Sequence, residues 1–153
     1  MAHLQAALPH YAIQLFPDNP AQYRFVHPLG AVLIGYQGSE FKELRDVDLI
    51  AQERRISLHF TVFGRGLNSD GAALDLLDAL RLAIVGFRPE NCERIHLLGE
   101  RFLDETAGAW QYELRAQTET MQVENRIEPN RPKLTAAFYR RPDQPLNPNR
   151  KPK

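Results

Sequence analysis

The segment GAALDLLDALRLAIVGFRP, residues 71–89, constrains the fold most strongly, because its pattern is that of an amphipathic helix, which needs a surface to bury against. Its apolar side chains recur at the spacing of one helical face: Ala73, Leu76, Leu77, Leu80, Ile84 and Phe87. Ser69, Asp70 or Gly71 is expected to cap its start. Gly86 is expected to take a left-handed conformation at its end, and Pro89 prevents continuation. Burying about six such side chains contributes on the order of 9–18 kcal/mol before conformational entropy is subtracted. We therefore expect this helix to lie across a sheet.

Several segments have the patterns of strands. Residues 54–66 alternate, with Ile56, Leu58, Phe60 and Val62 on one side and Ser57, His59, Thr61 and Phe63 on the other. Residues 109–123 alternate in the same way, with Trp110, Tyr112, Leu114 and Ala116 on the apolar side. One buried and one solvated face is typical of an antiparallel sheet. Residues 93–103 and 109–123 flank a glycine turn and are expected to form a long hairpin. The short apolar run 30–38 predicts a strand buried on both faces.

Two other segments, residues 2–15 and 39–55, have weaker patterns than the strands and the helix above. Residues 2–15 carry Leu4, Leu8, Tyr11 and Leu15 at helical spacing, which predicts a helix that ends before Pro17. Residues 39–55, SEFKELRDVDLIAQERR, are charged and irregular. We interpret them as an exposed, mobile loop with a helical turn. The chain of 153 residues fits one domain with a real core.

The end of the chain differs sharply from the rest in charge. The whole chain has a formal net charge of zero, yet from residue 125 onward eight basic residues face only Glu128 and Asp143. The segment 125–153 therefore carries +6, and the other 124 residues, with eleven basic and seventeen acidic side chains, carry −6. Six of the eleven prolines also lie in this segment, which argues against a packed core there. A charge split of this kind suggests an interaction arm.

The candidate interaction residues lie in this basic, proline-rich arm. They include the aromatic pair in LTAAFYRR, residues 134–141, which could dock on a neighbour. The full set is Arg126, Arg131, Lys133, Phe138, Tyr139, Arg140 and Arg141. Three interpretations stay open: a solvated end, an arm that lies on another subunit or an acidic partner, and a contact with DNA.

No segment has the pattern of a catalytic or metal site. None of the five histidines stands at a metal-ligand spacing. Asp75 and Asp78 are expected to be solvated, and the glycine-rich GRGLNSDG lacks the lysine of a phosphate-binding loop. The single Cys92 has no obvious base partner and excludes an intrachain disulfide. Trp110 and Tyr112 are expected to pack in the core rather than stack on bases. We expect no enzyme activity, no cofactor and no metal.

The sequence also lacks membrane and export signals. No apolar run approaches the roughly 18 residues needed to cross a bilayer. The start, MAHLQAALPHYAIQLF, has no basic region and is interrupted by Pro9, so it does not read as a signal peptide. We expect the protein to fold in a cytoplasm and to have no membrane partner.

In the order helix, strand, charged loop, strand, glycine loop, helix, hairpin and tail, the chain resembles the tail-terminator and minor tail proteins of tailed bacteriophages. It is most similar to the Gp37-type family of Mu-like phages. The resemblance covers about residues 20–124 and is carried by HPLGAVLIGYQGSEF, QERRISLHFTVFGRGL, GAALDLLDALRLAIVGFRP and IHLLGERFLDETAGAWQYELRAQTETMQVE. LLDALRLAIVGFRP followed by a strand, a turn and W-x-Y is its most telling part. The basic extension departs from the simplest form of the family.

The resemblance implies an α+β fold, an antiparallel sheet with helices packed on one face, in residues 1–124, ahead of the arm 125–153. It implies a virion protein of the tail that assembles in the host cytoplasm as a ring, usually a hexamer. Such a ring caps the tail tube, ends its polymerisation and offers a docking surface to the head-tail connector protein, while DNA passes through it. Two alternatives stay open: another head–tail joining or minor tail component, and a small nucleic-acid-binding module that uses the basic tail.

Overall fold

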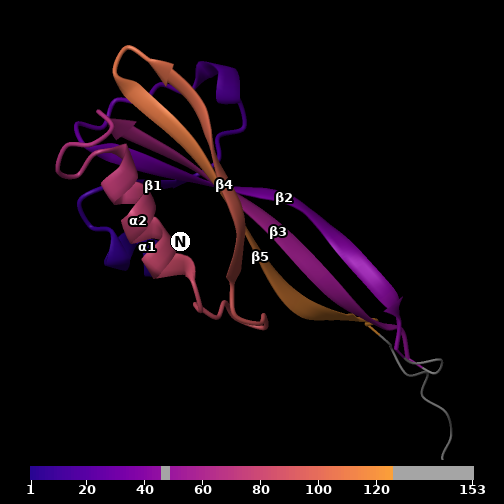
Figure 1. The fold of residues 1–153 in the computed structure, drawn as a ribbon. Helices are drawn as coiled ribbons and strands as arrows, with labels where there is room; N and C mark the ends of the chain where they lie inside the picture. Colours follow the sequence, from indigo (N-terminus) through magenta and orange to yellow (C-terminus); the bar gives the residue numbers. More distant parts are fainter. Residues whose placement is uncertain (46–48, 126–153) are drawn as a thin grey trace, which may run out of the picture.

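The structure, a computed structural model, describes residues 1–45 and 49–125 (Figure 1). Its elements are, in chain order, α1 (Ala2–Ala7), β1 (Ala12–Leu15), a 3-10 turn η1 (Pro20–Gln22), β2 (Gly30–Leu44), β3 (Ala51–Arg65), α2 (Ala73–Ile84), β4 (His96–Thr106) and β5 (Ala109–Val123). The strands form one five-stranded sheet in the order β1-β2-β3-β5-β4. The fold is α+β and is mostly sheet.

The sheet is mixed rather than purely antiparallel. β1 runs parallel to β2, with Ala12 opposite Ala31, whereas the other neighbouring pairs are antiparallel. The expected helix over residues 2–15 is therefore wrong in its second half. α1 ends at Ala7, two residues before Pro9, because proline has no amide hydrogen to donate and its ring clashes with the preceding turn. The chain then turns and adds a short strand to the edge of the sheet.

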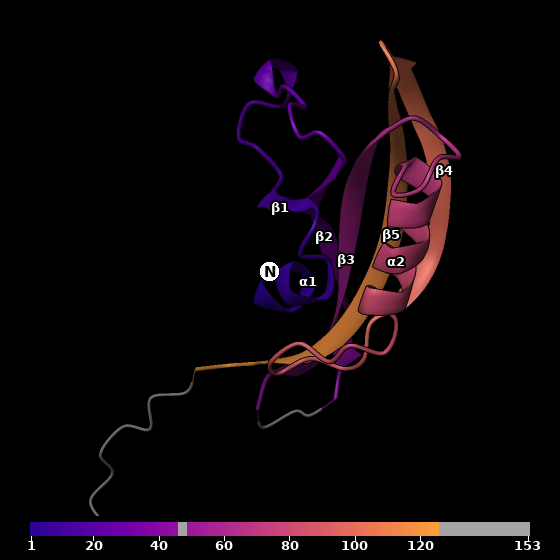
Figure 2. The same cartoon turned by 90° about the vertical axis from the view of Figure 1, so that its left-hand side faces the viewer.

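Both helices lie on the same side of the sheet, the side that faces the viewer in Figure 2. Five of the six residues of the apolar stripe expected for residues 71–89 are at most 2% exposed: Ala73, Leu76, Leu77, Leu80 and Ile84. The sixth, Phe87, follows the end of α2 and is half-buried against the same core. These side chains form one core with Leu4 and Leu8 of α1, Phe60 and Val62 of β3, and Leu114 of β5. The predicted apolar sides of the two long strands reach this core from Leu58 to Val62 and from Tyr112 to Ala116, whereas Ile56 and Trp110 lie outside it.

The prediction for the start of α2 is wrong, and the prediction for its end is confirmed. Ala72, rather than one of residues 69–71, holds the N-terminal capping position, and its methyl group cannot accept a hydrogen bond. Instead, Asp75 reaches back from the first turn and accepts a hydrogen bond from the amide of Gly71 at 2.8 Å. At the other end, Gly86 has a φ of 77°, so the predicted left-handed glycine is confirmed.

Among the described residues, a second buried cluster lies on the opposite face of the sheet, near β1 and the start of β2. Ala31, Leu33 and Phe63 are buried there beneath the connection that precedes β2. The rings of Tyr23 and Phe25 lie 5.3 and 5.6 Å from that of Phe63. The start of the predicted strand 30–38 is thus buried on both faces, as expected.

Beyond this core, three strands continue as a long projection, which we call the arm: residues 39–44 of β2, 51–57 of β3 and 117–123 of β5. Figure 1 shows it extending away from both helices. The interpretation of residues 39–55 as a loop is therefore wrong over most of its length. These residues pair along a ladder in which Glu40 is opposite Arg55 and Phe41 is opposite Arg54. Cross-strand pairing of opposite charges stabilises strands that have little apolar surface to bury.

Candidate assembly surface

The arm presents two different faces, because successive side chains of a strand point to opposite sides. β3 is its central strand, paired with β2 on one side and with β5 on the other. Both helices cover the other end of the sheet (Figure 1). The arm is thus a thin, two-sided surface, and its side chains determine what it can contact.

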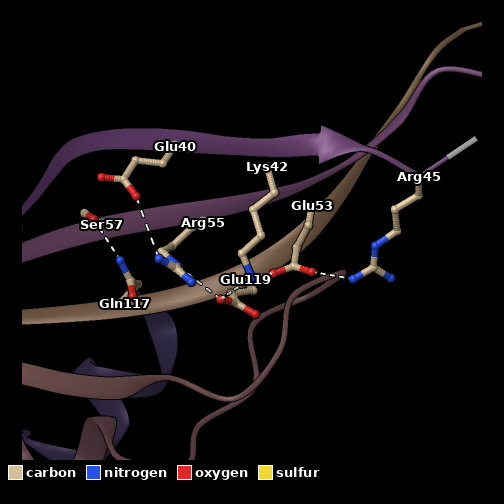
Figure 3. A network of polar contacts seen from close by, with 8 residues as sticks. All are labelled: Glu40, Lys42, Arg45, Glu53, Arg55, Ser57, Gln117 and Glu119. Carbon is tan, nitrogen blue, oxygen red and sulfur yellow. Dashed lines mark hydrogen bonds and ion pairs between the residues drawn. The ribbon is translucent and has the colours of Figure 1, made fainter.

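One face of the arm is a network of charged side chains (Figure 3). Arg55 lies between two carboxylates, with Nε 3.2 Å from Oε1 of Glu119 and a terminal nitrogen 3.8 Å from Oε2 of Glu40. Lys42 forms an ion pair with Glu53, and its Nζ is 3.8 Å from Oε1 of Glu119. We call this the charged face. Its cations and anions balance one another, so it does not favour ligands of either sign.

Glu53 is at the centre of this network. Its side chain is only 13% exposed and forms ion pairs with both Lys42 and Arg45. The hydrogen bond from Lys42 is the main cause that holds the pKa of Glu53 below its usual value, and the charges of Lys42 and Arg45 act in the same direction. The carboxylate is therefore ionised at neutral pH and joins β3 to the end of β2.

The other face of the arm, together with Tyr36 just before the arm on β2, carries aromatic rings. The hydroxyl of Tyr36 donates to Oγ of Ser39 at 3.0 Å, and Nε of Arg54 donates to the same oxygen at 2.9 Å. The guanidinium of Arg54 also lies 5.8 Å from the ring centre of Phe41. Hydrogen bonding with Ser39, and then with Arg54, lowers the pKa of Tyr36. Tyr36 and Phe41 are both exposed, so this face offers apolar contact area.

The end of the arm is also apolar. Exposed aliphatic side chains gather where the three strands finish: Leu44, Ile50, Met121 and Val123. The amide of Glu124 donates to the carbonyl of Ile50 at 2.8 Å, which holds the end of β5 against the start of β3. The basic segment therefore begins at the far end of the arm, away from the helices (Figure 1). Its predicted interaction residues lie outside the described residues: Arg126, Arg131, Lys133, Phe138, Tyr139, Arg140 and Arg141.

The connection between α2 and β4 follows the outer edge of β5 within the arm. The amide of Glu93 donates to the carbonyl of Glu119 at 2.7 Å, and the hydroxyl of Thr118 donates to the carbonyl of Glu93 at 2.6 Å. An open hollow at this place is lined by side chains of both signs, among them Arg45, Arg88, Glu93 and Glu119. The hollow is therefore not selective for an anion or a cation. Cys92, which also lines it, is a half-buried thiol.

The residues considered for chemistry have structural surroundings. Asp75 accepts the amide of Gly71, and Asp78 forms an ion pair with Arg81 on the same helix. The glycine-rich connection after β3 is fixed by the amide of Ala73, which donates to the carbonyl of Gly66 at 3.2 Å. The contacts of Asp75 with Gly71 and of Ala73 with Gly66 hold the junction between β3 and α2.

His59 and the aromatic side chains of β4 and β5 contact other rings of the sheet, and of the two aromatics predicted for the core, Tyr112 packs against it whereas Trp110 lies outside it. His59 lies against Gly35, with Phe16 edge-on at 5.1 Å, and His96 is exposed on the edge strand. Phe102 lies 5.8 Å from Trp110 and 5.6 Å from Tyr112 across the β4–β5 ladder. Within residues 1–45 and 49–125, no group of three or more acidic, cysteine or histidine side chains is placed to hold a metal ion.

Sequence reasoning missed the arm, which is the most distinctive surface of the described chain. Its signal was weak, because both faces of a solvated strand carry polar residues and no apolar alternation arises. The usable signal is the succession of charges two residues apart: Glu40 and Lys42 in one segment, Glu53 and Arg55 in the next. That spacing places the members of each pair on one face and lets the two segments complement each other.

Comparison with known proteins identifies the family of this chain. No curated protein matches the chain. None of the helices in the described part of the chain combines the length and the apolarity needed to cross a membrane. The family model described as Gp37 protein matches residues 1–141, which include the sheet, both helices, the arm and the first part of the basic segment. The chain therefore belongs to the Gp37 family, is a phage protein and, as that family suggests, has a structural role.

Proposed function

We propose that this phage protein forms a closed ring, a hexamer, on the end of the tail tube. The ring ends tube polymerisation and offers the surface on which the head-tail connector protein docks. Its role is structural, with no catalytic step and no cofactor, and it is a component of the virion tail that assembles in the host cytoplasm. DNA passes through the ring without sequence-specific contact.

The observation that carries this proposal is the incomplete pairing of the sheet. β4 is an outermost strand, and β1 covers only Ala31–Ile34 of β2. Unpaired strand edges are ready templates for another chain, and soluble monomers usually protect them. A ring places one patch of each copy against a different patch of the next copy. In the part of the chain that the structure describes, the sheet has two separate edges without a neighbouring strand, and these can serve as the two patches.

The charge split supports a second contact between copies. Residues 1–124 carry −6 and the basic segment carries +6, and that segment begins at the end of the arm. Attraction between the segment of one copy and the acidic body of the next strengthens the ring. The same charges also suit a nucleic-acid-binding module. A DNA titration at several salt concentrations separates the two roles, because binding through phosphate contacts falls steeply with salt.

The proposed function is tested by preparing phage tails without this protein and imaging them by electron microscopy. Overlong or unfinished tubes are expected, and adding back the purified protein should restore a uniform length. Tails of normal length that carry no heads would instead identify a head–tail joining component and would contradict the terminator role. Tails of normal length with heads attached would contradict both the terminator role and the head–tail joining role. Leu82→Ala is the matched control for add-back, since that exposed helical side chain lies outside the proposed contacts.

A further inference from the structure

The sheet has two long stretches of strand that no described strand covers, and they lie on opposite edges. One is β4, eleven residues from His96 to Thr106. The other is the part of β2 from Gly35 to Leu44, which has ten residues, because β1 pairs only as far as Ile34. The two open stretches therefore match in length.

We propose that β4 of one copy pairs antiparallel with the open part of β2, Gly35–Leu44, in the next copy. This inference rests on the proposed function and deepens it by naming the two surfaces that join the ring. The partner is a second copy of this chain. The arm of each copy then becomes part of a sheet that continues from subunit to subunit.

Strand direction supports this pairing. β2 is antiparallel to β3, β3 to β5, and β5 to β4, so β4 and β2 run in opposite directions. When copies are related by rotation about an axis that is not perpendicular to the strands, corresponding strands of all copies run in the same sense along that axis. In such a ring β4 meets the next β2 antiparallel, which is the more stable kind of ladder. This antiparallel contact is possible because β2, β3, β5 and β4 alternate in direction, so the first and the last of these four strands run in opposite directions.

The heights of the two stretches also agree with a closed ring. Arg101, in the middle of β4, is opposite Glu113 of β5, which is opposite Thr61 of β3, which in turn is opposite Leu33 of β2. The middle of β4 therefore lies at the same height along the strands as Leu33. The open part of β2 is centred near Ser39, about six residues further along, or about 20 Å at the usual rise per residue. The four strands of one copy span about 19 Å across the sheet. A rise equal to the width requires strands inclined by about 45° to the ring axis, at the upper end of the range for closed barrels.

The side chains of the two stretches are suited to contact. β4 exposes Leu98, Phe102 and Leu103, and β2 exposes Tyr36, Phe41 and Leu44. The described parts of both stretches contain no proline, the residue that most directly blocks edge pairing. Each stretch also has two register irregularities, which bend it locally. Such irregular edges disfavour arbitrary strands and favour a partner whose bends match, which gives the contact selectivity.

The pairing is tested by disulfide crosslinking of the full chain, in a Cys92→Ser background that leaves no native thiol. In the proposed register, with Ser39 or Glu40 opposite Arg101, Glu43 lies within one residue of the position opposite Leu98, and Gln37 lies within one residue of the position opposite Leu103. All four are exposed positions at the two ends of the contact. Double variants Glu43→Cys with Leu98→Cys, and Gln37→Cys with Leu103→Cys, are oxidised and run on non-reducing denaturing gels. Opposite residues of an antiparallel pair are close enough for a disulfide. Each β2 cysteine is also combined with the two neighbouring β4 positions, so that a one-residue shift of register is detected.

The expected result is a ladder of covalent oligomers that ends at the copy number of the ring, while every single-cysteine variant stays monomeric on the gel. Covalent dimers from the Leu98→Cys or Leu103→Cys single variant would show that β4 pairs with itself about a twofold axis, and would overturn the inference. Rings in native mass spectrometry without crosslinks in any pair would also overturn it, yet would leave the proposed function standing. Monomers alone in native mass spectrometry would contradict both.

Discussion

Gly35 of β2 and His59 of β3 lie opposite each other, and the imidazole occupies the space that a side chain at position 35 would need. A Cβ built on Gly35 would stand 2.2 Å from two ring atoms of His59, and Phe16 borders the ring from the side. This contact lies where β1 ends and the open part of β2 begins.

Gly35→Ala should therefore destabilise the protein by roughly 1–3 kcal/mol, the usual cost of overpacking a filled site. The change is measured by chemical unfolding followed by circular dichroism. The matched background is His59→Ala, in which the imidazole is gone and Gly35→Ala should cost much less. An equal cost in both backgrounds would show that the ring does not impose glycine at position 35.

Leu80 is fully buried on α2 between the helix and the sheet, whereas Leu82 on the same helix is 84% exposed. Leu80→Ala should lower the free energy of unfolding by roughly 2–5 kcal/mol, because it leaves a cavity in the main core. Leu82→Ala should change it by less than about 0.5 kcal/mol. Similar losses from both substitutions, measured by chemical unfolding, would contradict the packing of α2 described above.

Glu53 links stability to pH through its ion pairs. Since its pKa in the folded protein lies below the usual 4.5, its contribution is present above pH 4.5 and is lost as the pH falls through the folded-state pKa. Glu53→Gln removes the charge and keeps the shape. The variant should thus show a smaller fall of Tm between neutral and acidic pH than the parent chain. Asp18→Gln, an exposed position outside the arm, is the control and should keep the parent pH profile. An unchanged profile in Glu53→Gln would show that the network does not hold this carboxylate ionised.

The basic segment should strengthen contacts between copies. A chain that ends at Asn125 should associate more weakly, and its association should depend less on salt, because attraction between opposite charges is screened by ions. A chain of full length with Arg126, Arg131, Lys133, Arg140 and Arg141 changed to Gln separates charge from length and should behave like the shortened chain. Sedimentation velocity over a salt series makes the comparison. Unchanged ring assembly and unchanged tail length in both variants would remove this role of the segment.

The parts of the fold that are predictable from the sequence are those that bury one face. Leu58, Phe60 and Val62 alternate because their side of β3 packs in the core beneath the helices, and residues 73–84 repeat apolar positions because one helical face contacts the sheet. In both segments the burial itself creates the pattern. The position of the glycine that ends α2 follows from backbone geometry alone.

The parts that sequence reasoning missed depend on partners distant in the chain. β1 has only four residues, too few to show a period, and its strand state comes from pairing with β2. The arm has no fully buried face, so its strand state depends on ladders between segments separated by as many as 72 residues, such as Ala51 opposite Val123. Its role as a candidate surface follows from where strands stop pairing, which local patterns do not encode.

The central claim is that this protein works by joining copies of itself on the end of the tail tube. Native mass spectrometry of the full chain, alone and mixed with the tail tube protein, tests it most directly. The account predicts a closed oligomer of one copy number, a hexamer, formed alone or on contact with the tube. A strictly monomeric chain in both samples would contradict it.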